Sequence, residues 1–119
     1  VAEDNALNAE VITAILNIHD ATCEVAANGE EAVAKFGMSA PGTFDMIFMD
    51  VQMPVMNGHD AARAIRAMDR PDAGTIPIIA MTANAFAEDE RQALACGMNA
   101  HVAKPIDVHA LERVVAELS

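Results

Sequence analysis

Residues 44–50, FDMIFMD, form a dense apolar run that ends in an acidic side chain. A run that is apolar on both faces is typical of a central strand in a parallel sheet, because helices cover both sides of such a strand. Residues 76–82, IPIIAMT, form a second run of this kind, in which Pro77 is tolerable only near the start of a strand. The two runs predict buried strands that end at Asp50 and Thr82.

Outward from these strands, short apolar runs alternate with segments of helical periodicity. The pattern predicts further strands at 22–27 and 100–103, and helices over 6–19, 28–39, 86–96 and 107–118, with one more helix opening at Asn57-Gly58. In the first helix Leu7, Val11, Ile15 and Ile18 are spaced to share one apolar face. The inner face of the last helix is expected to be Val108, Leu111, Val115 and Leu118. Alternating strands and helices with short connections indicate an open, doubly wound α/β sheet.

Length and composition limit the classes of function. A chain of 119 residues is one domain, and 53% hydrophobic with 21% charged residues is typical of a globular protein. A net charge of −11 would repel phosphate backbones, which disfavours direct binding to nucleic acid. The sequence has no apolar run of roughly 20 residues and no secretion signal pattern, so we expect a cytoplasmic domain without membrane contact.

Polar side chains stand where four predicted strands end: a short first strand at the start of the chain and the strands at 44–50, 76–82 and 100–103. They are Glu3-Asp4-Asn5, Asp50, Thr82 and Lys104. The carboxyl ends of parallel strands meet at one edge of a sheet, so we expect these side chains to share one cleft. Clustered carboxylates repel each other unless a cation compensates, and oxygen ligands suit Mg²⁺, with Mn²⁺ as an alternative. Together with Lys104 and the hydroxyl of Thr82, the cation would accommodate a phosphoryl group, for which Asp50 is the best nucleophile.

Each of these residues also has an ordinary structural explanation. Glu3-Asp4-Asn5 could only cap the first helix, Asp50 could be a loop acid, Thr82 a cap and Lys104 a solvated lysine. The combination at the correct strand ends favours the phosphoryl site. A phosphatase of the haloacid dehalogenase type is an alternative, but it would need a second acid where Gln52 stands. A non-phosphorylated interaction scaffold is another alternative.

Four segments carry a resemblance to a known family. AEDNALN (2–8), MDVQMPVMNG (49–58), MTAN (81–84) and AKPI (103–106) resemble the receiver domains of two-component response regulators. The resemblance implies a flavodoxin-like, five-stranded parallel sheet of order 2-1-3-4-5 with five helices. It also implies that Asp50 is phosphorylated, with Mg²⁺ held by Glu3, Asp4, Asp50 and the backbone carbonyl of Gln52.

The resemblance assigns roles to several further residues. Thr82 and Lys104 would contact phosphoryl oxygens, and Lys104-Pro105 would be a cis peptide bond. Gln52 and Asn84 hold positions that tune the lifetime of the aspartyl phosphate. His101 stands where the family often has an aromatic switch residue, which puts that part of the mechanism in question here. Only Val1 and Ala2 precede Glu3, so the first strand is shorter than usual, and we expect that the natural protein has residues before Val1.

The resemblance also implies partners. A histidine kinase or a histidine phosphotransfer domain would donate the phosphoryl group to Asp50. Phosphorylation of Asp50 would then change the surface formed by residues 86–96, 100–103 and 107–118. The domain would catalyse its own phosphorylation and dephosphorylation without being a free-standing enzyme. The motifs look most like receivers of hybrid sensor histidine kinases, whose parent protein can be attached to a membrane. Met53 and Met56, in the segment after Asp50, are candidates for partner contact. The sequence does not give the cognate kinase or the oligomeric state.

Overall fold

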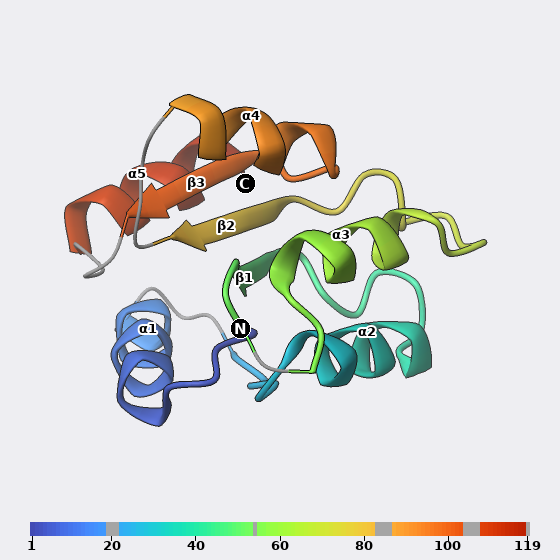
Figure 1. Ribbon diagram of the computed structural model, residues 1–119. Helices are drawn as coiled ribbons and strands as arrows, with labels where there is room; N and C mark the ends of the chain where they lie inside the picture. Colours follow the sequence, from blue (N-terminus) through green and yellow to red (C-terminus); the bar gives the residue numbers. More distant parts are fainter. Residues whose placement is uncertain (19–21, 54, 83–86, 104–107, 119) are drawn as a thin grey trace.

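The computed structural model describes residues 1–18, 22–53, 55–82, 87–103 and 108–118. Three strands and five helices occur in these residues (Figure 1). In chain order they are α1 (Ala6–Ile18), α2 (Gly29–Met38), β1 (Ile47–Asp50), α3 (Gly58–Arg66), β2 (Ile78–Thr82), α4 (Ala87–Ala95), β3 (Ala100–Ala103) and α5 (Val108–Leu118). Within the described ranges, no helix has the length and apolar character needed to cross a membrane.

The sheet is parallel, and β2 lies between β1 and β3. Beyond β1 the pairing continues through Ala2, which forms single parallel bridges to Met49 and to Ala26. The spatial order therefore matches the expected 2-1-3-4-5, and the fold class is confirmed. The expected strand at 22–27 is wrong in extent, because only Ala26 pairs there. Val1 and Glu3 are its hydrogen-bonding partners, and a partner this short supports only one bridge.

Alternate residues of the central strands enter two separate cores. Ile78 and Ala80 of β2 face the helices α2, α3 and α4, whereas Ile79 and Met81 face α1 and α5. The same alternation holds in β1, where Met49 belongs to the first core and Phe48 to the second. Every residue of β1 and β2 is buried, as the apolar runs predicted. The strands are shorter than expected, since β1 begins at Ile47 and β2 at Ile78.

The buried faces of α1 and α5, the two helices of the second core, match the expected faces to different degrees. In α1 the buried residues are Ala9, Ile12, Ile15 and Leu16, so only Ile15 of the expected apolar face is inside. Leu7, Val11 and Ile18 are 67%, 42% and 79% exposed. In α5 Leu111 is fully buried, but Val108 is 45% exposed. α1 therefore turns a different stripe to the sheet from the expected one, whereas α5 keeps Leu111 and Val115 of its expected face against the second core.

The guanidinium of Arg66, at the end of α3, fastens the amino ends of β2 and β3. It donates hydrogen bonds to the carbonyl oxygens of Gly97 and Ala73 and to Oδ1 of Asn99. The same Oδ1 accepts the backbone N–H of Ile78, the first residue of β2. Desolvation lowers the pKa of Arg66 from its usual value, but the group keeps its charge at neutral pH. These contacts join the segments before both strands to one cation.

An apolar cavity of about 260 Å³ lies at the amino end of the sheet, away from the carboxylates. Its lining includes Val1, Cys23, Phe36, Phe44, Phe48 and Val115. The backbone nitrogen of Val1 donates to the carbonyl oxygen of Glu24 at its edge. The cavity lies beside Ala2, the residue that forms the single bridges to Ala26 and Met49.

Candidate phosphoryl-transfer site

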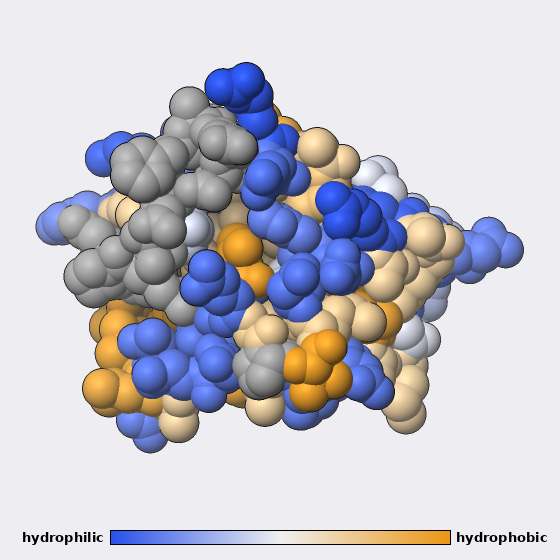
Figure 2. All heavy atoms as spheres, viewed as in Figure 1, coloured by the Kyte–Doolittle hydropathy of each residue, from blue (hydrophilic) through white to orange (hydrophobic). Residues whose placement is uncertain are grey.

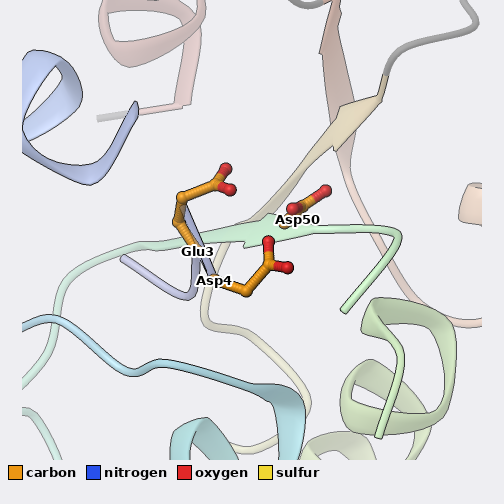
Figure 3. Close-up of side chains that lie close together, drawn as sticks. All are labelled: Glu3, Asp4 and Asp50. Carbon is orange, nitrogen blue, oxygen red and sulfur yellow. The ribbon is translucent and has the colours of Figure 1, made fainter. Parts of the chain in front are cut away.

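Three carboxylates converge at the carboxyl end of the sheet. Glu3, Asp4 and Asp50 each offer an oxygen, and these oxygens lie within 4.8 Å of one another. Figure 3 shows the three side chains directed toward a common space. Glu3 and Asp50 are 2% and 3% exposed, whereas Asp4 is exposed. Negative charges this close repel one another, so the cluster favours a compensating cation.

The backbone around Ala2 explains why residues so distant in sequence meet. The N–H of Ala2 donates to the carbonyl of Phe48, and the N–H of Asp50 donates to the carbonyl of Ala2. This pairing places Glu3 and Asp4 beside the end of β1. Asn5 then begins α1, because its side-chain Oδ1 accepts the N–H of Asn8 at 3.1 Å. Asn5 therefore performs the capping that was the alternative explanation for the acidic pair, and Glu3 and Asp4 are left to form the cluster.

A cavity of about 210 Å³ opens above the carboxylates. It is lined by Glu3, Asp4, Asn5, Asn8, Asp50, Val51, Gln52 and Thr82. Thr82 reaches it from the neighbouring strand, since Asp50 pairs with Met81 and Thr82 is the next residue. The N–H of Gln52 donates to Oδ1 of Asp50 at 3.2 Å, which orients the carboxylate. A carboxylate, a hydroxyl and further acidic oxygens thus share one small space.

Two close backbone contacts fix the loop that follows Asp50. A Cβ at Gly58 would stand 2.2 Å from the carbonyl oxygen of Asp50, so only glycine allows this approach. The N–H of Gly58 also donates to the carbonyl of Val51 at 2.9 Å. A Cβ at Gly29 would meet the carbonyl oxygen of Met56 at 2.3 Å. Asn57 accepts the N–H of Asp60 and so caps α3 directly behind the loop. The site rests on backbone packed too closely for any larger residue.

Four of the predicted site residues are not among the described residues that meet at the cavity above Asp50. Lys104, Pro105 and Asn84 are outside the described residues, and so is the expected cis peptide bond. His101 lies in β3, where it pairs with Ala80 and is half-buried. The described part of the chain thus brings Glu3, Asp4, Asp50, Gln52 and Thr82 together.

Two residues near the carboxylates had not been singled out from the sequence as site residues. Asn8 lines the cavity above Asp50, and it follows the cap residue Asn5 by three residues, a spacing that puts it in the first turn of α1. His59 lines a second cavity of about 420 Å³ beside Asp4, together with Val51, Gln52, Met53 and Asn57. The side chain of His59 is half-buried, and its Nε2 is enclosed. The spacing of Asn8 was a usable signal, whereas nothing in the sequence marked His59.

Comparison with known proteins identifies the family. Residues 1–116 match the response regulator receiver domain family. The chain is 36% identical to hybrid signal transduction histidine kinase I of Dictyostelium discoideum over 117 residues, which are 97% of this chain and 7% of that kinase. It is 36% identical over 114 residues to the sensor protein GacS of Pseudomonas syringae pv. syringae, which covers 95% of this chain and 12% of that protein.

Solved structures agree with this assignment. The receiver domain of the sensor histidine kinase PA1611 from Pseudomonas aeruginosa PAO1, solved with a magnesium ion in its active site cleft, is 36% identical. The match has a TM-score of 0.86 and covers 98% of this chain and 92% of that one. The receiver domain of Ssk1 from Saccharomyces cerevisiae, solved with the histidine phosphotransfer protein Ypd1, is 32% identical, with a TM-score of 0.86 and coverage of 98% and 84%. From its sequence, its sheet order and these relatives, the chain belongs to the response regulator receiver domains of two-component signalling.

Proposed function

We propose that Asp50 accepts a phosphoryl group from a phosphohistidine. One carboxylate oxygen of Asp50 attacks phosphorus, and the bond between phosphorus and the histidine nitrogen breaks. The nitrogen takes the bonding electron pair and then a proton, which leaves a neutral imidazole and an aspartyl phosphate. The observation that carries this proposal is the buried carboxylate of Asp50 beside Glu3 and Asp4, within 4.8 Å, under an open cavity.

The donor set around Asp50 suits a hard divalent cation. Carboxylates of Glu3, Asp4 and Asp50 and the carbonyl oxygen of Gln52 would hold Mg²⁺, which prefers oxygen ligands and retains waters. When bound, the ion would neutralise the acidic cluster and draw charge from the phosphoryl oxygens. Glu3 is buried and accepts the N–H of Asn5 at 3.1 Å, so its carboxylate is held in place before any ion arrives. The magnesium ion of the PA1611 receiver domain supports the same class of ion here.

The remaining site residues would bind the transferred phosphoryl group and pass a structural change on to the surface of the domain. Thr82 offers a hydroxyl donor from the adjacent strand, and Lys104, as the family pattern implies, would add a positive charge. Thr82 would move toward the new phosphoryl oxygens. Since β2 pairs directly with β3, that shift would reach His101 and then the surface formed by α4, β3 and α5. Gln52 and Asn84 would set how fast water removes the phosphoryl group.

We further propose that the donor is a histidine phosphotransfer domain or the equivalent domain of a kinase. Its histidine must reach Asp50, so the donor has to rest on the rim of the cavity. Leu7 and Val11 lie in the first two turns of α1, the helix that begins two residues after Asp4, and their apolar side chains are exposed. Figure 2 shows hydrophobic atoms gathered over α1 at the lower left of the molecule. The complex of Ssk1 with Ypd1 supports this class of partner.

The protein to which this domain belongs is part of the proposal. The chain spans only 7% of the length of each of the first two Dictyostelium relatives, both of which are hybrid histidine kinases. We propose a hybrid sensor histidine kinase as the parent protein, in the cytoplasm or attached to a membrane through other segments.

Labelling with phosphoramidate tests the proposed chemistry directly. In the presence of Mg²⁺ the chain should gain the mass of one phosphoryl group, and Asp50→Asn should gain none. Chelation of the metal with EDTA should stop the reaction. Labelling that continues in Asp50→Asn would show that another residue is the acceptor. Labelling at an unchanged rate in EDTA would show that the reaction does not need the metal.

A further inference from the structure

Val55 adopts a backbone conformation that its side chain disfavours. Its φ angle is +69°, and it is the one residue other than glycine with a positive φ among the described residues. A β-branched side chain in the left-handed region crowds its own backbone, and glycine or asparagine would suit the position better. The strain therefore has to be outweighed by something else in the protein or its complexes.

The side chain of Val55 does nothing for the core. It is 75% exposed, whereas Met53 and Met56 on either side of it are half-buried and pack against the core of α2, α3 and α4. The sequence had suggested both methionines as partner contacts, and their half-buried side chains leave only part of their surface for such a contact. Their apolar atoms are used internally, and Val55 presents its own to solvent. A strained and exposed apolar side chain indicates a role outside the folded domain.

The loop geometry keeps Val55 close to the phosphorylation site. Gly58 lies against the carbonyl of Asp50, and Val55 precedes it by three residues. Three residues span at most about 11 Å, so Val55 lies within roughly 15 Å of that carbonyl. Met53 and Asn57, which flank the loop on both sides of Val55, line the cavity beside Asp4. The loop therefore borders a cavity that shares Asp4, Val51 and Gln52 with the cavity above Asp50.

We propose that Val55 is a docking residue for the phosphodonor domain, the partner that the proposed function assigns to Asp50. A standard protein interface buries about 800 Å² on each partner, which corresponds to a disc of roughly 16 Å radius. A donor centred on Asp50 thus covers the position of Val55. An apolar side chain that is exposed before docking and buried after it would contribute to affinity. Val55 thus adds an exposed apolar side chain from the loop after Asp50 to those of Leu7 and Val11 on α1.

This proposal predicts opposite effects on stability and on transfer. Val55→Asn should relieve the backbone strain and raise the ratio of folded to unfolded protein roughly fivefold in urea titrations. It should also slow phosphoryl transfer from phosphorylated Ypd1 about tenfold, because the apolar contact is lost. Val55→Thr keeps the branched shape and the strain, so stability should be unchanged. It replaces one apolar methyl group with a hydroxyl, so transfer should be slower. Val55→Ile should retain both properties of the parent chain.

Two controls separate docking from chemistry. Phosphoramidate needs no docking surface, so all three variants should be labelled at the parental rate. Met38→Gln removes an apolar side chain that is 88% exposed, at the far end of α2 from the loop contact of Gly29, and should change neither reaction.

Each other outcome has a definite meaning. Transfer from Ypd1 to Val55→Asn and Val55→Thr at the parental rate would overturn the docking role, and loss of phosphoramidate labelling in them would assign Val55 to the site itself. A parent chain that is labelled by phosphoramidate but not by Ypd1 would contradict the partner class. Failure of the parent chain with phosphoramidate would instead refute the proposed function.

Discussion

Replacement of Gly58 by alanine tests whether the position of Asp50 governs the reaction. The new Cβ would stand 2.2 Å from the carbonyl oxygen of Asp50 and 3.0 Å from Cα of Val51. Real Cβ contacts are essentially never shorter than 3.0 Å, so the two segments must separate by at least 0.8 Å. Both contacts are to backbone, which cannot rotate away as a side chain can. A displacement near 1 Å at a reacting group slows a positioned reaction by about a hundredfold.

The expected result is a phosphoramidate labelling rate about a hundredfold below that of the parent chain. Alanine is the better helix former, so helix propensity alone would not make Gly58→Ala destabilising. Gly74→Ala is the matched neutral control, because its Cβ would meet nothing within 4 Å. Gly42→Ala imposes a φ of +84° on alanine far from the carboxylates, and it should lower stability by about 1 kcal/mol without slowing labelling. Labelling of folded Gly58→Ala at the parental rate would refute the reasoning that backbone contact positions Asp50.

Three further predictions concern stability and are measured by urea titration. Leu111→Ala should cost about 2–5 kcal/mol, because Leu111 is fully buried between α5 and the sheet; a cost under about 1 kcal/mol would contradict that packing. The hydrogen bond from Arg70 lowers the pKa of Asp72 from 3.8, so its ionised form stabilises the fold above that value and the contribution is lost as the pH falls through the lowered pKa. Asp72→Asn should therefore lose stability less steeply than the parent chain below about pH 4, and equal slopes would refute this. Asn28→Ala removes the acceptor for the N–H of Glu31 at the start of α2 and should cost about 1 kcal/mol, with unchanged phosphoramidate labelling as the check that the effect is local.

Much of the fold could be predicted because the central strands leave few alternatives. A strand such as IIAMT, apolar at every position, must be covered on both faces, and only a doubly wound sheet does this in so short a chain. The caps at Asn28 and Asn57 and the positive φ of Gly97 follow from local chemistry, so the limits of α2 and α4 and the start of α3 were correct within one or two residues. The strand at 22–27 failed because strand formation depends on a partner, which the local sequence does not reveal.

The buried face of α1 shows where periodicity stops being informative. Leu7, Val11 and Ile18 are spaced as well for burial as Ile12 and Leu16, so the sequence offers two apolar stripes. Ala9 lies on the buried stripe, where a small side chain permits close approach to the sheet. Which stripe faces inward depends on the shape of the sheet beneath, and that is a property of the whole fold. The exposed stripe is then available to a partner.

The candidate site was more predictable than its surroundings. Strand ends meet at one edge of a parallel sheet whatever the side chains are, so Asp50 and Thr82 could be placed together from topology alone. The enclosure of His59 and the exposure of Val55 depend on how one loop folds against Asp50, and spacing carries no information on that.

The cluster around Arg66 has a mechanical consequence for the sheet. It joins β2 and β3 where both strands begin, and Thr82 stands where β2 ends at the cavity. The two strands also pair along their length, up to Thr82 and Ala103, so with their amino ends held the easiest motion is a change of twist between them about that end. Over five residues, or about 17 Å, a rotation of 3° moves the free ends by about 0.9 Å relative to each other. A small twist therefore displaces the strand ends at the cavity while leaving the Arg66 end almost still.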